Sequence, residues 1–511
     1  MLHPRRFTGR ADNGRAAVLS AGTALVMMSA VGVGAAACSG TATATYARRP
    51  ATPLSARTRQ PGSAVSVLTG TPDAIAAGVA QDLFASAPVV VLAAPGRAAD
   101  LAAAAADAVR EHAPLLLTSA EPALIHALHP RAVLAVGFAK DALAGQLPRI
   151  RVATGLAKLP ATKAPAPLDH VVLLVREGDS GAGTVAAVAT ARAAGARVIG
   201  VSGNDPQTDP AAIAALSAAR PRQVIAVGTG FGPAGELAAR LAVAETGVQL
   251  PGGGQVMFPL HRLVALYGHP GTPSLGALGQ QGLRASVARA RELAAPYRAM
   301  SAVPVIPAFE IIATVAEASP GPDGDYSYET PVASLRPWVR RASAAGMYVI
   351  LDLQAGRASL LAQAKMYQSL LRLPDVGLAI DPEWKLQPRQ LPLRQIGSVS
   401  VSQVNGVIRW LAGLTARYRL PQKVLVLHQF RLSMISGEQW LDTRYGDLAI
   451  VVHMDGQGTP ADKEQTWAAV TQAAPVGVFF GWKNFFTKDH PMMSPPQTMA
   501  RSPQPVMISY Q

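Results

Sequence analysis

The segment Asp375–Trp384, DVGLAIDPEW, carries the clearest indication of both fold and site. A short apolar run leads directly into Asp381 and Glu383, which is the pattern of a buried strand that ends in carboxylates. Two carboxylates two positions apart in an extended chain project to the same side, where each raises the pKa of the other. A carboxyl group that keeps its proton near neutral pH can serve as a general acid.

Similar apolar segments flank this one on both sides, and helical patterns fill most of the intervals between them. The expected strands are residues 263–267, 305–313, 348–353, 376–380, 424–428, 449–453, 476–480 and 506–510. The expected helices include residues 282–295, 332–345, 359–372, 402–418 and 461–473. Eight strands with helical crossovers predict a (β/α)8 barrel of the TIM type over residues 256–511.

Polar side chains gather where these strands end. In a (β/α)8 barrel the C-terminal ends of all eight strands face one shared mouth, where active sites form. We therefore expect catalytic carboxylates from Glu383, Asp381, Asp352 and Glu310. We expect ligand contacts from His428, Gln429, Asp455, Trp384, Trp482 and Lys483, with the indole faces stacking on sugar rings.

The end of the fourth barrel strand resembles that of chitinase-type glycoside hydrolases, whose D-x-D-x-E motif ends in the acid/base glutamate. Asp381 and Glu383 match the last two carboxylates, and Ala379 stands in the place of the first. The resemblance implies that Glu383 is the proton donor and Asp381 its orienting partner. Glycoside cleavage also needs a nucleophile or a base that activates water. The candidates for this further carboxylate are Asp352, Glu310 and Asp455.

Residues 63–255 alternate short β-branched or apolar segments with alanine-rich helical stretches, which is typical of parallel strands in a layered βαβ domain. The expected strands are residues 65–68, 89–93, 115–118, 132–136, 171–175, 198–201 and 224–227. Residues 129–137, HPRAVLAVG, recur as residues 220–228, RPRQVIAVG. This echo predicts an internal duplication.

The order of these parts resembles the type-two cell wall-binding repeat. An alanine-rich helix, then residues 113–118 (APLLLT) and then residues 131–137 (RAVLAVG) follow one another as in that family. The second copy has Ala196–Val201 in place of the APLLLT step. The resemblance implies noncovalent attachment to an anionic cell-wall polymer or wall polysaccharide.

The N-terminus has the pattern of an export signal. Four arginines in residues 1–15 precede the uncharged stretch Ala16–Ala37, and small residues lead into Cys38, the only cysteine of the chain. Residues 35–38 resemble a bacterial lipobox, which implies that residues 1–38 are a signal, that Cys38 is lipidated and that the protein lies at the extracytoplasmic face of the membrane. A single transmembrane anchor is the alternative. Residues 39–62 are expected to form a flexible tether.

The net charge of +14 does not indicate nucleic-acid binding. Half of the surplus lies in residues 1–62, which hold eight arginines and one acid. Cations in this position favour contact with a membrane or an anionic envelope polymer. One cysteine excludes an intramolecular disulfide and a site with several cysteines, and we expect neither a cofactor nor a metal.

Several alternatives stay open. His269, His428 and His453 with neighbouring acids contain metal-ligand types, without an HExxH spacing. Residues 228–232, GTGFG, follow a strand as a phosphate-binding loop would, but do not fit GxGxxG. The loop of residues 318–330 combines acids with two tyrosines that could contact a sugar or a cation. The barrel is thus expected to hydrolyse envelope glycan or, without catalysis, only to recognise sugar.

Overall fold

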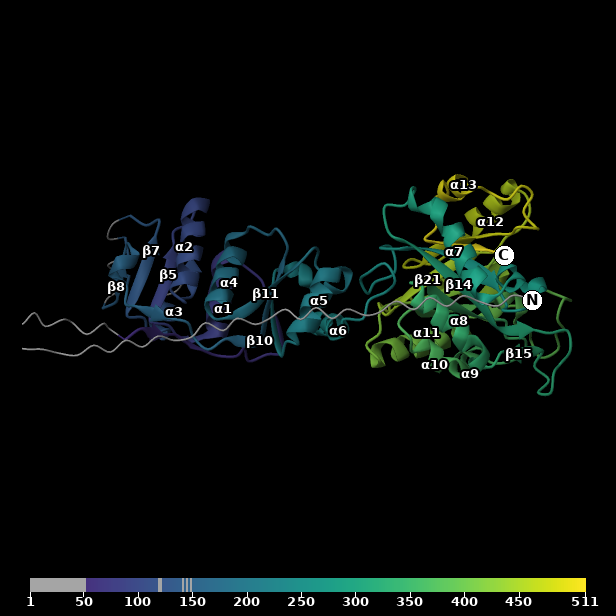
Figure 1. Ribbon diagram of the computed structural model, residues 1–511, viewed down its shortest axis with the longest axis horizontal. Coiled ribbons are helices and arrows are strands. Elements are labelled where there is room, and N and C mark those ends of the chain that lie inside the picture. Colours follow the sequence, from purple (N-terminus) through teal and green to yellow (C-terminus); the bar gives the residue numbers. More distant parts are fainter. Residues whose placement is uncertain (1–51, 118–121, 140–141, 144–145, 148) are drawn as a thin grey trace, which may run out of the picture. The chain divides into compact units, whose positions relative to one another are not determined.

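The computed structural model describes residues 52–511, apart from residues 118–121, 140–141, 144–145 and 148 (Figure 1). Residues Thr52–Gln511 form one compact unit. The expected signal, the lipidation site Cys38 and the first part of the expected tether lie outside the described residues. Within the described ranges, no helix has the length and apolar character needed to cross a membrane.

The C-terminal half is a closed barrel of eight parallel strands, which confirms the expected TIM-type architecture. The first strand pairs with both the second and the last, so the barrel has no open edge. Its strands are β13 (Arg262–Gly268), β14 (Val305–Ala316), β16 (Tyr348–Leu353), β17 (Val376–Ile380), β19 (Lys423–Gln429), β21 (Leu448–Met454), β22 (Phe479–Asn484) and β23 (Met507–Tyr510). A ninth strand, β15 (Ser327–Glu329), pairs antiparallel with the end of β14.

Helices surround the barrel, as Figure 1 shows for α7, α8 and α11. They are α7 (Leu283–Arg298), α8 (Val332–Ala344), α9 (Leu360–Met366), α10 (Gln368–Leu371), α11 (Val401–Arg417), α12 (Pro460–Ala473) and α13 (Pro495–Met499). Two short strands, β18 (Val399–Ser400) and β20 (Ile435–Ser436), pair with each other beside the barrel. The apolar faces of α7, α8, α9, α10 and α11 pack on every second residue of the strands, including Leu351, Leu378 and Leu425.

The remaining strand residues point into the barrel and form two layers. The lower layer is an apolar core built from Leu263, Ala265, Ile306, Ala308, Tyr348, Ile350, Ala379, Val424, Val426, Ala449, Val451 and Met507. Because side chains alternate along a strand, the next inward position lies two residues further toward the C-terminal end. Those positions are polar, and they place a polar layer directly above a packed apolar one.

Two barrel elements differ from the sequence expectation. The strand expected at residues 476–480 lies at β22, because Val476 is 94% exposed and Gly477 has a φ of +92°, so the chain still turns there. The helix expected at residues 359–372 is divided into α9 and α10 at Tyr367. The hydroxyl of Tyr367 donates to the carbonyl oxygen of Ala313 at 2.7 Å, which fixes this ring against the barrel.

The N-terminal half contains two four-stranded parallel sheets, with the orders β6-β5-β7-β8 and β11-β10-β12-β3. The first consists of β5 (Val89–Ala93), β6 (Leu115–Leu117), β7 (Ala132–Val136) and β8 (Arg151–Ala153). The second consists of β3 (Val65–Leu68), β10 (Leu168–Arg176), β11 (Ala196–Val201) and β12 (Gln223–Val227). The echoed segments are β7 and β12, which hold the same place in each order. A relationship to cell wall-binding repeats stays a prediction.

Helices from both halves of this region contribute to one apolar core that also receives side chains from both sheets. The helices of this core are α1 (Pro72–Leu83), α3 (Pro122–Ala127) and α4 (Ala182–Ala193). The α2 helix (Ala98–Arg110) packs in a second apolar cluster, and α5 (Pro210–Ala219) and α6 (Ala234–Ala244) pack in a third. The α1 and α4 helices supply Val79, Ala187 and Ala191 to this core, together with Val90 of β5 and Leu173 of β10.

The expected tether at residues 39–62 requires a correction in its described part. The β1 strand (Leu54–Ser55) pairs with β9 (Thr162–Lys163), and β2 (Arg57–Thr58) pairs with β4 (Phe84–Ser86). This stretch has no apolar periodicity of its own, so local sequence gives no sign of strands. Its backbone hydrogen bonds are made to partners distant in the chain.

Gly377 lies where two barrel strands approach each other closely. An added Cβ at Gly377 in β17 would lie 2.6 Å from the carbonyl oxygen of Val424 on the neighbouring strand. Gly377→Ala should therefore lower the free energy of unfolding by roughly 1–3 kcal/mol, measured by urea denaturation. Gly413→Ala in α11 is the control, because nothing surrounds that position and alanine favours a helix. Equal stability of both variants would contradict this close packing.

Candidate functional site

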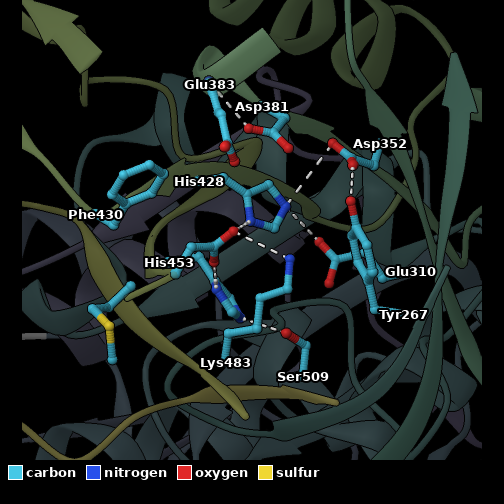
Figure 2. A network of polar contacts seen from close by, with 12 residues as sticks. Tyr267, Glu310, Asp352, Asp381, Glu383, His428, Phe430, His453, Lys483 and Ser509 are labelled. Carbon is cyan, nitrogen blue, oxygen red and sulfur yellow. Dashed lines mark hydrogen bonds and ion pairs between the residues drawn. The ribbon is translucent and has the colours of Figure 1, made fainter. Parts of the chain in front are cut away.

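Each barrel strand contributes one inward polar side chain at its C-terminal end, and Figure 2 shows how they converge. We call this set the polar layer: Tyr267, Glu310, Asp352, Asp381, His428, His453, Lys483 and Ser509. Every member is at most 4% exposed. Asp381 follows β17 directly, and the others lie within their strands. Burying so many titratable groups is costly unless they pair with one another.

His428 lies at the centre of the polar layer and joins two carboxylates. Its Nε2 lies 2.8 Å from Oε1 of Glu310, and its Nδ1 lies 2.7 Å from Oδ2 of Asp455, which follows β21. Oδ1 of Asp352 is 3.9 Å from the same Nε2. Burial disfavours the charged imidazole, but Asp455 and Glu310 outweigh it and raise the pKa of His428 well above its usual value.

Asp455 is held by three side chains. It accepts from His428, from Nδ1 of His453 at 2.9 Å and from Nζ of Lys483 at 3.2 Å. Burial would raise the pKa of this carboxyl, but His428 and Lys483 reverse the effect and hold it well below the usual range. The pKa of Glu310 is also lowered, since His428 outweighs the effect of burial. Both carboxyl groups are therefore ionised.

Two members of the polar layer were not expected from the sequence. The Tyr267 hydroxyl donates to Oδ2 of Asp352 at 2.8 Å, and Nζ of Lys483 lies 3.7 Å from the centre of the Tyr267 ring. The Ser509 hydroxyl lies 3.2 Å from Nε2 of His453. The alternation of inward positions could have identified both, because Tyr267 follows Ala265 by two residues and Ser509 follows Met507 in the same way.

The arrangement of Asp381 and Glu383 requires a correction. They do not project from one extended strand, because Pro382–Trp384 form a 3₁₀ turn directly after β17. Proline is suited to the first position of such a turn, and Oδ1 of Asp381 accepts from the backbone N–H of Glu383 at 3.2 Å. Asp381 consequently lies inside the polar layer, whereas Glu383 lies at the rim and is partly exposed.

Three carboxyl groups at the barrel mouth, those of Asp352, Asp381 and Glu383, have raised pKa values, whereas the pKa values of Asp455 and Glu310 are lowered. Burial, opposed by His428 but reinforced by the charge of Glu310, raises the pKa of Asp352 to about 6. Burial and Asp352 raise the pKa of Asp381 well above its usual value. Burial and the charge of Asp455 raise the pKa of Glu383. Carboxyl groups with opposite shifts in one site are the arrangement that acid–base catalysis requires.

A cavity of about 390 Å³ opens beside Glu383. Its lining comes from the 3₁₀ turn, from the following loop and from the end of β14 and the segment after β19: Ala316, Glu383, Trp384, Leu386, Pro392, Leu393, Arg394, Gln395, Ile396 and Arg431. The loop returns onto the turn, where the N–H of Gly397 donates to the carbonyl oxygen of Glu383 at 2.7 Å. A Cβ at Gly397 would lie only 2.4 Å from that oxygen, so this approach requires glycine.

The structure brings together most, but not all, of the expected site residues. Hydrogen bonds and ion pairs join Glu310, Asp352, His428, Asp455 and Lys483 in one network. Asp381 interacts electrostatically with this network, and Glu383 and Trp384 line the cavity. Trp482 faces outward and packs on Trp467 with ring centres 5.5 Å apart, and Gln429 donates to Glu438 at 2.8 Å. Each of these two directly adjoins an inward residue in its strand, so alternation turns it away from the mouth.

A metal ion could in principle use His428, His453 and Asp455, whose ligand atoms all lie within 4.8 Å of one another. In the structure, however, both histidines approach Asp455 through Nδ1 at hydrogen-bonding distance. The ammonium group of Lys483 also lies 3.2 Å from Asp455 and would repel a divalent cation. These contacts favour a hydrogen-bonded network. His269 contacts Thr272 and Thr330 instead.

The raised pKa of Asp352 makes folding stability depend on pH. Its pKa is about 6 in the folded protein against 3.8 ordinarily, so the folded state binds more protons, and stability falls as pH rises between these values. Asp352→Asn cannot ionise and should gain roughly 1–3 kcal/mol relative to the unchanged protein over that interval. Urea denaturation at pH 4 and pH 7 measures the difference. The exposed Asp169→Asn should show no such gain, and a pH-independent effect of Asp352→Asn would refute the shift.

Comparisons of the chain with family models, with curated proteins and with solved structures find no match. The function must therefore be argued from the barrel mouth itself. Its distinguishing features are an ionised Asp455 held by three partners and a rim carboxyl group, Glu383, beside an open cavity.

Proposed function

We propose that the barrel hydrolyses glycosidic bonds in an envelope glycan, with Glu383 as the proton donor. The observation that carries this proposal is the state of Glu383. It is partly exposed, lines the cavity and has a raised pKa. Its carboxyl group forms no hydrogen bond or ion pair within the described part of the chain. A carboxyl group with a raised pKa and no internal hydrogen-bond partner is available to protonate a substrate.

Asp455 is the best second carboxylate. Its side chain keeps 10% exposure, whereas those of Glu310 and Asp352 are fully buried. Its low pKa keeps it ionised, as a nucleophile or a water-activating base must be. The charge of Asp455 also raises the pKa of Glu383, so the two groups interact electrostatically. The opposite pKa shifts of Glu383 and Asp455 favour a protonated acid and an ionised base at the same pH.

The proposed reaction combines proton transfer from Glu383 with attack at the anomeric carbon of the sugar. Glu383 gives its proton to the glycosidic oxygen as that oxygen separates from the anomeric carbon. Asp455 either takes a proton from the water that attacks the anomeric carbon or attacks that carbon itself. In the second case water then displaces Asp455 from the carbon and gives a proton back to Glu383. Water supplies the hydroxyl group that the anomeric carbon finally carries. His428 and Lys483 orient Asp455, and Glu310 in turn supports the charge on His428.

The envelope location rests on the sequence. The basic and apolar N-terminus and the lipobox-like residues 35–38 support export and lipidation at Cys38. The resemblance of residues 63–255 to cell wall-binding repeats supports contact with wall polysaccharide or another anionic polymer. A lipid-anchored enzyme in that position would meet glycan as its main polymeric neighbour.

The second candidate is a noncatalytic sugar-binding protein. The specific observation in its favour is the ion pair between Asp455 and Lys483, because a carboxylate held by an ammonium group is a weaker nucleophile or base. In this case Trp384 and the rim would recognise sugar without cleaving it.

The decisive experiment measures reducing ends released from purified cell-wall glycan by the soluble chain of residues 52–511, which form one compact unit. Glu383→Gln should lower the rate by about 10²–10⁴-fold because the proton donor is lost. The matched control is Glu317→Gln, an exposed carboxylate beyond β14. Release that is equal in both variants, or binding to the wall without any release, would replace the enzyme by the binding protein.

The pH dependence of kcat/KM provides an independent check. Activity requires Glu383 protonated and Asp455 ionised. Because the pKa of Asp455 is lowered and that of Glu383 is raised, the active window should extend from below pH 3.8 to above pH 4.5. We expect a bell-shaped profile whose alkaline limb reports Glu383. A rate that rises steadily from pH 4.5 to pH 8 would mean that an ionised Glu383 is the active form.

A further inference from the structure

Two arginines line the cavity that contains Glu383. Arg394 lies on the loop that follows the 3₁₀ turn, and Arg431 follows β19. Both are exposed, and neither forms an ion pair or a side-chain hydrogen bond within the described residues. Glu383 is the only acid among the lining residues, so the cavity wall carries an excess of positive charge. Unpaired guanidinium groups that face one cavity are available to an anion.

The arginines are carried by anchored segments. The guanidinium group of Arg357 donates to the carbonyl oxygen of Gln390 at 2.8 Å, and the loop returns to the turn through Gly397. The guanidinium carbon of Arg431 lies 5.9 Å from the centre of the Phe430 ring, which restricts its position. Trp384 contributes an aromatic surface to the same wall. The cavity therefore combines an aromatic face with two cationic groups.

We propose that this cavity binds an acidic sugar, one that carries a carboxylate or phosphate group, beside the bond to be cleaved. Guanidinium groups bind both kinds of oxyanion through paired N–H donors, and an indole ring contacts the apolar face of a sugar. The volume lies within the range of pockets for small ligands. This inference rests on the proposed hydrolase function and names its substrate class.

An acidic sugar would also raise the pKa of the proton donor, Glu383. An anion bound near Glu383 disfavours its ionised form, so Glu383 should keep its proton to higher pH in the complex than in the free enzyme. The alkaline limb of the kcat profile would then lie at higher pH than that of kcat/KM, because kcat reports the complex. A neutral substrate would leave the two limbs together.

The binding test uses the Glu383→Gln chain of residues 52–511, which prevents turnover. The probes are purified teichuronic acid, which carries carboxylates, the same polymer after chemical reduction of its carboxylates to alcohols, and wall teichoic acid, which carries phosphates. We add Arg394→Gln and Arg431→Gln, singly and together. Arg389→Gln is the control, because it removes the same charge from an exposed residue of the same loop outside the cavity lining.

We expect each cavity variant to weaken binding of the preferred acidic polymer by about threefold to tenfold, and the double variant by more than tenfold. The reduced polymer should bind weakly to all variants, and Arg389→Gln should leave affinity unchanged. Teichuronic and teichoic acids distinguish carboxylate from phosphate as the recognised group. Equal binding of the reduced polymer, or full binding by the double variant, would overturn the inference.

The two proposals fail in different ways. If the unaltered chain releases reducing ends only from neutral glycan, the hydrolase stands and the acidic substrate is wrong. If arginine-dependent binding occurs but no polymer is cleaved, the anion-binding cavity stands and the hydrolase is wrong. Circular dichroism of each variant establishes that the barrel is folded, so a loss of binding reports the cavity.

Discussion

The contact of His428 with Glu310 and Asp455 is the interaction on which the barrel mouth depends. The upper interior holds four carboxyl groups, those of Glu310, Asp352, Asp381 and Asp455, against the cations His428 and Lys483. Four negative charges would exceed two positive ones in a region with almost no access to water. The pKa shifts oppose this excess, because the pKa values of Asp352 and Asp381 are raised whereas those of Glu310 and Asp455 are lowered. The carboxyl groups therefore differ in how readily they ionise.

Within the site, the buried polar groups and the rim group Glu383 have different roles. The buried groups form a fixed network in which each ionised member has a partner, so they resist rearrangement. Glu383 stands above that network, on a turn that removes it from the strand and leaves its carboxyl group without an internal partner. Burial and the neighbouring charge of Asp455 raise the pKa of Glu383. A fixed polar layer and an available rim group are what a preorganised site requires.

Much of the barrel fold could be predicted from the sequence, because strand alternation and apolar periodicity are local properties. All eight barrel strands were located, with one displaced by the turn at Gly477. The side from which a strand residue projects was harder to assign. The sequence predicts Trp482 and Gln429 at the mouth, but both face outward, and strand-end polarity alone does not single out Tyr267 and Ser509. Pairing between distant segments, as in the strand at Arg57–Thr58, leaves no local pattern to recognise.

The return of the loop onto the carbonyl oxygen of Glu383 through Gly397 couples the rim carboxyl group to the cavity wall. The backbone that carries the rim carboxyl group is also the anchor of the loop that forms the cavity wall. A change in the length of that loop would move the anchor as well as the wall. Selection for a different ligand would therefore act on the position of Glu383 at the same time, and the two properties would have to evolve together.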